Sequence, residues 1–217
     1  MLGVALGETR TSPLRVLCLG AHADDIEIGC GGSLLRLLRE RPGSSVRWVV
    51  FSASPERAQE ARASAAAFLA DAAQTEVIVR DYRESYFPAA TSDIKDFFET
   101  LKRSEALDLV LSHRREDLHQ DHRTVAELTW NTFRDHLVLE YEIPKYEGDL
   151  GQPNVFVPLP DGLARRKIEL ILLHFASQRG RSWFRGETFE AVMRVRAVEC
   201  NAPEGFAEGL YGRKIRL

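Results

Sequence analysis

Cysteine is scarce in this sequence, and the few cysteines are not paired. The 217 residues include three, Cys18, Cys30 and Cys200, with no Cys-x-x-Cys spacing among them. An odd number of widely spaced cysteines argues against a disulfide framework and against a zinc site built on thiolates. We therefore expect the chain to fold without disulfides in a reducing compartment, which favours the cytoplasm.

The sequence also lacks a long apolar run and an excess of charge of one sign. No run approaches the roughly 20 apolar residues that a membrane-spanning helix needs. The stretch from Met1 to Pro13 lacks the basic start of a signal peptide. The 29 basic residues nearly balance the 32 acidic ones, so the net charge of −3 gives no indication of nucleic-acid binding. We expect neither a membrane nor a nucleic acid as partner.

What the sequence does contain is typical of a soluble enzyme-sized domain. Hydrophobic residues make up 44% of the chain and charged residues 28%, which is ordinary for a globular protein. Domains commonly contain about 100–200 residues, so residues 1–217 are expected to form one domain.

Strand-like and helix-like segments alternate through the first two thirds of the chain. Short apolar or β-branched runs predict strands at 16–19, 46–51, 76–79 and 108–111. Helical patterns follow them at 33–38, 55–73, 94–101 and 123–133. Such alternation predicts a Rossmann-like α/β fold, with a mostly parallel sheet and helices on both of its faces. Further strands are expected at 137–143, exposed on one face, and at 155–157, with another helix near 168–175.

A first polar cluster lies where the first strand ends. His22, Asp24 and Asp25 fall within four residues, directly after Gly20. In open α/β sheets, ligands bind beyond the carboxyl ends of the strands. An imidazole and two carboxylates at this place are able to bind a metal ion, although the same residue types are also common in solvated turns.

A second polar cluster, His119-Gln120-Asp121-His122, lies in the loop after the fourth predicted strand. Taken alone, it is equally consistent with a polar loop in which Asp121 caps a helix. Both clusters, however, are expected at the same edge of the sheet. Together they predict a metal site at the carboxyl ends of the strands.

The ligand types favour zinc, because a catalytic zinc site has three protein ligands and one open position. His22, Asp25 and His122 would supply two nitrogens and one oxygen. Fe²⁺ is compatible with the same ligands. Asp24 and His119 then remain beside the metal, and they suit a general base and a group that stabilises developing charge.

The paired motifs resemble those of the LmbE-like, or PIG-L, family of zinc-dependent N-deacetylases. The resemblance rests on 22–25, on Gly29-Cys30-Gly31-Gly32 and on 119–122. It extends to Arg57-Ala58-Gln59-Glu60, and more weakly to 205–209 near the end of the chain. The family removes acetyl groups from N-acetylglucosamine units of larger molecules.

The resemblance implies a role for each matching residue. Zinc would be held by His22, Asp25 and His122, and Asp24 would be the general base on the zinc-bound water. His119 would stabilise the tetrahedral intermediate or protonate the leaving amine, with Asp121 orienting it. For Arg57, the resemblance and its place after the second predicted strand suggest contact with the substrate.

Two other functions remain open at this point. One is a metal-dependent hydrolase of a different amide or an ester, and the other is a non-catalytic sugar- or nucleotide-binding protein of the same fold. The substrate is expected to be a small amino sugar or its conjugate, and a homo-oligomer is possible. The sequence leaves the roles of Glu27, His113 and Asp117 undecided.

Overall fold

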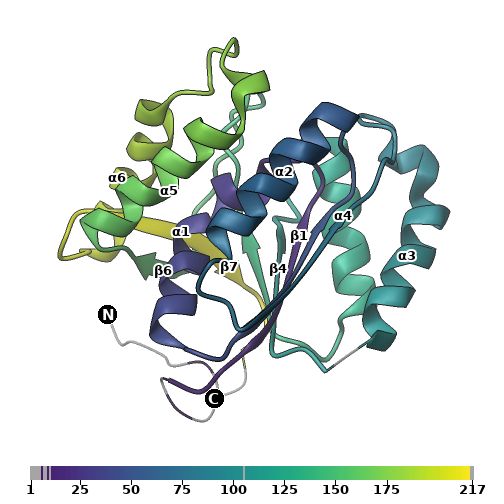
Figure 1. The fold of residues 1–217 in the computed structure, drawn as a ribbon, viewed down its shortest axis with the longest axis horizontal. Coiled ribbons are helices and arrows are strands. Elements are labelled where there is room, and N and C mark those ends of the chain that lie inside the picture. Colours follow the sequence, from purple (N-terminus) through teal and green to yellow (C-terminus); the bar gives the residue numbers. More distant parts are fainter. Residues whose placement is uncertain (1–5, 7–8, 10, 105, 216–217) are drawn as a thin grey trace.

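Seven strands of the computed structural model pair into one sheet, in the order β3-β2-β1-β4-β5-β7-β6 (Figure 1). The structure describes residues 6, 9, 11–104 and 106–215, so most of the stretch from Met1 to Pro13 lies outside the described residues. The strands are β1 (Arg15–Gly20), β2 (Ser45–Val50), β3 (Gln74–Val79), β4 (Leu109–His113), β5 (Val138–Tyr141), β6 (Val155–Pro158) and β7 (Ala207–Gly212). The helices are α1 (Asp25–Glu40), α2 (Pro55–Phe68), α3 (Thr91–Ser104), α4 (Gln120–Thr132), α5 (Asp161–His174) and α6 (Gly186–Cys200), with short 3-10 helices η1 (Phe87–Ala90) and η2 (Ala176–Gln178).

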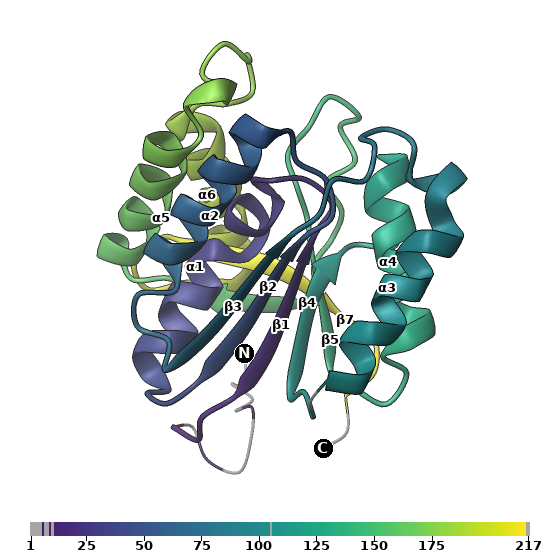
Figure 2. The same ribbon diagram turned by 45° about the vertical axis from the view of Figure 1, so that its right-hand side comes forward.

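The predicted α/β fold with a mostly parallel sheet is confirmed. Strands β1 to β5 pair in parallel, whereas β7 runs antiparallel between β5 and β6. Figure 2 shows α3 and α4 on one face of the sheet and α1, α2, α5 and α6 on the other. A hydrophobic cluster lies under each layer, so the central strands are buried on both faces. Because β1, β2, β4 and β5 run parallel, the loops that follow them lie at the same edge of the sheet.

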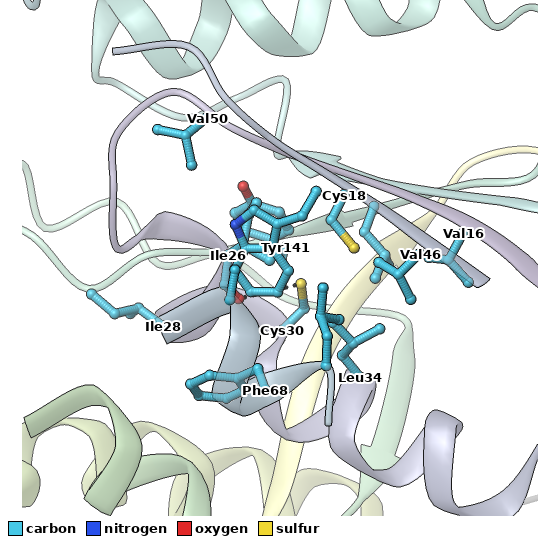
Figure 3. Packing of buried hydrophobic residues seen from close by; sticks show 14 of the residues in the cluster. Val16, Cys18, Ile26, Ile28, Cys30, Leu34, Val46, Val50, Phe68 and Tyr141 are labelled. Carbon is cyan, nitrogen blue, oxygen red and sulfur yellow. Dashed lines mark hydrogen bonds between the residues drawn. The ribbon is translucent and has the colours of Figure 1, made fainter. Parts of the chain in front are cut away.

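Helix α1 differs from the prediction. A helix was predicted at 33–38, but it begins earlier, at Asp25, and is broken at Cys30, whose φ of −143° is not helical. The glycines around the break permit close packing rather than a loop. A Cβ on Gly29 would lie 2.1 Å from Cδ2 of Tyr141, and one on Gly31 would lie 2.7 Å from Phe68. Figure 3 shows Tyr141 and Phe68 in the same buried cluster as Cys30, where the helix is broken. This packing fixes the turn that carries the first polar cluster.

Strand β5 corrects a second expectation. Its alternating pattern predicted one exposed face, yet all four residues are buried. Glu140 accepts a bond from Trp130 Nε1 at 2.5 Å and pairs with Arg213. Glu142, just beyond the strand, pairs with Arg196 at 2.6 Å. Both carboxylates are buried with partners from distant parts of the chain, and no local pattern could reveal those partners.

The last quarter of the chain contains two elements that the hydrophobic pattern did not predict, α6 and β7. Among the described residues, no helix is long and apolar enough to cross a membrane.

Candidate metal centre

Three potential ligand atoms converge at the carboxyl edge of the sheet. The turn after β1 supplies His22, the first turn of α1 supplies Asp25, and the first turn of α4 supplies His122. His22 Nδ1 lies 3.2 Å from His122 Nε2 and 3.4 Å from Asp25 Oδ2, and the latter two atoms are 3.5 Å apart. Ligands around tetrahedral zinc are about 3.3–3.6 Å from one another, because each lies about 2.0–2.2 Å from the metal. The spacing of these three atoms fits such an ion.

Outer carboxylates leave the converging nitrogens free to bind a metal. Asp121 Oδ2 lies 3.2 Å from Nε2 of His22, and Asp117 Oδ2 lies 3.0 Å from Nδ1 of His122. A carboxylate accepts a hydrogen bond from the N–H that faces it, so in the neutral ring the lone pair lies on the other nitrogen. Those other nitrogens are the two atoms that converge with Asp25.

The electrostatics of the cluster favour a cation. Burial raises the pKa of Asp25, but the imidazoles of His122, His113 and His22 outweigh it, so the pKa lies well below its ordinary value. Burial lowers the pKa of His22, yet Asp25 and Asp121 raise it to about 10. Positive charge is thus stabilised between these carboxylates, and a metal ion would supply it without the proton.

Two other groupings of potential ligands also lie close together. They are His22, His119 and His122, and Asp25, His113 and His122. In the second grouping, His113 Nε2 accepts a hydrogen bond from Ala21 N–H at 2.9 Å, so its lone pair is engaged. The ring of His113 stacks on that of His122 with centroids 4.0 Å apart. His113 is therefore placed to support the cluster rather than to bind its metal.

His119 is the N-cap of α4, and its tautomer follows from that position. Its Nδ1 accepts the backbone N–H of Asp121 at 3.2 Å, which places the proton of the neutral ring on Nε2. Burial, followed by the charge on His22, lowers the pKa of His119. The residue is thus a neutral donor from Nε2, which suits hydrogen bonding to a developing oxyanion. In this tautomer its nitrogens do not offer a lone pair to the metal.

Asp24 has one oxygen held and one oxygen free. Arg57 Nη2 donates to Oδ1 at 2.7 Å, whereas Oδ2 is buried and has no hydrogen-bond partner among the described residues. Burial raises the pKa of Asp24, and the Arg57 guanidinium opposes that effect. Arg57 itself is held in the first turn of α2, where its N–H donates to the side chain of Ser54. A carboxylate with one free buried oxygen is suited to take a proton.

The acidic residues Asp117 and Asp121, beside and within the first turn of α4, contact both histidine rings of the centre. Asp121 contacts the ring of His22, while it reaches His119 through its backbone N–H. Its carboxylate also accepts the N–H of Ser85 at 2.6 Å. Asp117, left undecided by the sequence, orients His122 and also accepts from Lys145 Nζ at 2.9 Å.

Two other features could not be obtained from the sequence. Lys145 comes from the loop after β5, and nothing in the local pattern connects it with Asp117. Glu27 is fully buried, and neither of its carboxyl oxygens has a hydrogen-bond partner among the described residues. Burial holds the pKa of Glu27 well above its ordinary value. It is not one of the converging ligands.

Comparison with known proteins points to one family. The model of the PIG-L family, described as GlcNAc-PI de-N-acetylase, matches residues 17–133, just over half of the chain. No curated protein matches the sequence.

Several solved structures share the fold at low sequence identity. The conserved protein TT1542 from Thermus thermophilus has 17% identity and a TM-score of 0.70, covering 94% of this chain and 96% of its own. N,N'-diacetylchitobiose deacetylase from Pyrococcus horikoshii has 17% identity and a TM-score of 0.67, covering 92% and 83%. The 4-carboxy-2-hydroxymuconate hydratase from Pseudomonas putida has 18% identity and a TM-score of 0.67, covering 94% and 98%. At these identities the likeness shows the fold, and the chemistry must be argued from the site.

Proposed function

The chain belongs to the PIG-L family, and from that premise we propose that it is a zinc-dependent N-deacetylase acting on an amino sugar or its conjugate. The proposal covers residues 1–217 as one domain. The observation that carries it is the set of His22 Nδ1, Asp25 Oδ2 and His122 Nε2, which lie 3.2–3.5 Å apart with both rings oriented by carboxylates. Solved deacetylases with this fold support the same reaction class.

The ligands would hold a divalent ion at the end of β1 and the start of α4. When bound, Zn²⁺ polarises the amide carbonyl and lowers the pKa of water toward about 7. Fe²⁺ is compatible with the same nitrogen and oxygen donors.

The residues around the ligands supply the proton transfers. Oδ2 of Asp24 accepts a proton from the water that attacks the amide carbon. Nε2–H of His119 donates to the carbonyl oxygen as it becomes an oxyanion. When the C–N bond breaks, the proton held by Asp24 passes to the leaving nitrogen, and acetate and a free amine result. General base catalysis of this kind contributes about 10²–10⁴ in rate.

Arg57 acts first on Asp24 in this proposal. Its contact with Oδ1 at 2.7 Å opposes the rise in pKa that burial causes at Asp24, and it leaves Oδ2 free. The contact between Arg57 and the substrate that the sequence suggested stays a prediction, as do a cytoplasmic location and a homo-oligomer.

The decisive experiment measures acetate release from N-acetylglucosamine glycosides with the purified protein. We expect activity that a strong chelator abolishes and added Zn²⁺ restores, with one metal per chain by elemental analysis. Full activity in chelator would refute the metal-dependent reaction. Cleavage restricted to other amides or to esters would favour the first alternative, and sugar binding without turnover would favour the second.

A further inference from the structure

Large apolar side chains are exposed beside the metal centre. Among the described residues, eight large hydrophobic side chains are exposed, and four of them lie on the loops after β3, β4 and β5. These four are Tyr86, Leu118, Tyr146 and Leu150, and we refer to them as the apolar rim. Leu118 is 57% exposed and Tyr146 is 72% exposed. Exposed apolar side chains that lie close together commonly mark a binding surface.

Each member of the rim has a chain neighbour tied to the metal centre. Ser85, before Tyr86, donates its N–H to Asp121. Asp117, before Leu118, lies with its Oδ2 3.0 Å from Nδ1 of His122. The same arrangement holds for the other two members on the loop after β5.

Lys145, before Tyr146, donates to Asp117 Oδ2 at 2.9 Å. Asp149, before Leu150, accepts from Lys145 Nζ at 2.6 Å and from the N–H of Leu118 at 2.7 Å. In all four cases a polar residue is bonded inward, and the apolar side chain beside it is exposed to solvent. The rim is thus built around the centre on three separate loops.

Contacts within the chain hold the residues of the rim and their neighbours in place. Lys145 and Asp149 are largely buried as an ion pair, with side chains 11% and 6% exposed. The guanidinium of Arg83 lies over the ring of Tyr86, 3.5 Å from its centroid. Tyr146 OH lies 3.3 Å from Ser182 Oγ, on the segment between α5 and α6. Apolar groups on a pre-ordered backbone bind a ligand without a large cost in ordering entropy.

We propose that the rim binds an alkyl or aryl aglycone of the substrate, so that the protein prefers amino sugars with apolar aglycones. This inference rests on the proposed function. In that reaction the acetyl group is only two carbons long and stays at the metal, so the remainder of the substrate must occupy the mouth of the site. An apolar aglycone would there cover side chains that are otherwise exposed to water.

The test uses N-acetylglucosaminides with methyl, butyl and hexyl aglycones, below the concentrations at which they form micelles. A fully buried methylene is worth up to about fourfold in binding. The rim would contact only one side of the alkyl aglycone, so each methylene would be partly buried. We therefore expect kcat/KM to increase at least about tenfold from the methyl to the hexyl glycoside. A methyl glycoside with an N-hexanoyl group in place of N-acetyl shows whether the rim takes the acyl side instead. A preference confined to that substrate would refute the aglycone site.

Variants locate the preference on the rim. Tyr146→Ser with Leu150→Ser removes two exposed rim side chains without touching the proposed ligands. Leu173→Ser with Val198→Ser is the matched control, because these residues are also exposed but lie on α5 and α6. We expect the hexyl-to-methyl ratio of kcat/KM to fall at least about threefold in the rim variant and to stay unchanged in the control. Equal ratios in the wild type and both variants would overturn the proposal.

Calorimetric binding of the same glycosides separates this inference from the proposed function. Tighter binding of the hexyl glycoside than of the methyl glycoside, without acetate release, would support the rim and refute the deacetylase. Acetate release at equal rates from all three glycosides, with equal affinities, would support the deacetylase and refute the rim.

Discussion

Replacing Asp24 by Asn should give a folded, metal-loaded and nearly inactive protein. The amide has the size of the carboxylate, and its oxygen can still accept from Arg57, which now contacts Oδ1 at 2.7 Å. The amide nitrogen then occupies the place of the free Oδ2, where a donor replaces an acceptor. Loss of a general base costs about 10²–10⁴ in rate, or about 2.7–5.4 kcal/mol in activation free energy.

Replacing the neighbouring Asp25 by Asn should instead give a protein that binds zinc poorly. Asp25 Oδ2 is the anionic member of the three converging atoms, and it lies within 3.5 Å of His22 and His122. Removal of a carboxylate that only orients a ligand typically costs about 10–100-fold in metal affinity. Loss of a ligand's own charge should cost more than that, so this variant should lose zinc on dialysis.

Both variants are measured by zinc titration against a competing chelator and by the kcat of acetate release at saturating zinc. Circular dichroism and thermal unfolding verify that they fold. The assignments would be swapped if Asp24→Asn lost its metal while Asp25→Asn retained it. An Asp24→Asn variant with wild-type kcat would remove the general base from the mechanism.

Three further variants test the surroundings of the ligands. Asp117→Asn should weaken zinc binding by about 10–100-fold in a chelator competition, because the charge that orients the imidazole of His122 is lost. Unchanged affinity would contradict that role. Arg57→Ala should retain zinc but lower kcat. The acidic limb of its pH–rate profile should move to higher pH, because the guanidinium no longer lowers the pKa of Asp24. An unshifted limb would refute the pairing of Arg57 with Asp24. Gly29→Ala should lower the free energy of unfolding by about 1–3 kcal/mol or more, because the new Cβ would lie 2.1 Å from the buried ring of Tyr141. Thermal unfolding measures this loss, and an unchanged melting temperature would show that the ring can move.

The sequence predicted those parts of the molecule that depend on local pattern. Alternating apolar runs and helical spacings were sufficient for the parallel sheet. The motifs at 22–25 and 119–122 were expected at one edge, and the structure brings three of their atoms within 3.5 Å. Parallel strands align their carboxyl ends, and this geometry makes such motifs meet.

Contacts over long sequence distances were not predictable in the same way. That Asp121 orients His119, as the resemblance implied, stays a prediction; no local pattern indicated that its carboxylate would lie against the ring of His22, 99 residues away in the chain. Lys145 contacts Asp117 from a loop whose path no periodicity specifies. The break in α1 was likewise not predictable. The spacing of apolar residues along a helix does not show that a residue from another element replaces one of its hydrogen bonds.

That break shows how the last part of the chain supports a site whose proposed ligands lie within the matched region 17–133. In a regular helix the N–H of Gly32 would donate to the carbonyl of Ile28. Instead Gly32 and Ser33 donate to Glu208 at 2.8 and 2.6 Å, and Lys167 donates to Ile28 O at 2.7 Å. Lys167 Nζ and Glu208 Oε1 also pair at 2.6 Å, with both side chains 3% exposed. A buried ion pair thus replaces the helical bonds one turn after Asp25.

Glu208→Gln should therefore be strongly destabilising. It leaves Lys167 with an uncompensated buried charge and places an amide donor against one of two backbone N–H groups. Breaking such a pair costs about 3–5 kcal/mol, so denaturant unfolding should show a loss of that size. Asp161→Asn is the matched control, since its pair with Arg165 is exposed and worth at most about 1 kcal/mol. Zinc affinity should also fall in Glu208→Gln, because the turn that carries Asp25 loses its support. A variant as stable as the control, with unchanged zinc affinity, would show that packing around Gly29 and Gly31 alone holds the turn.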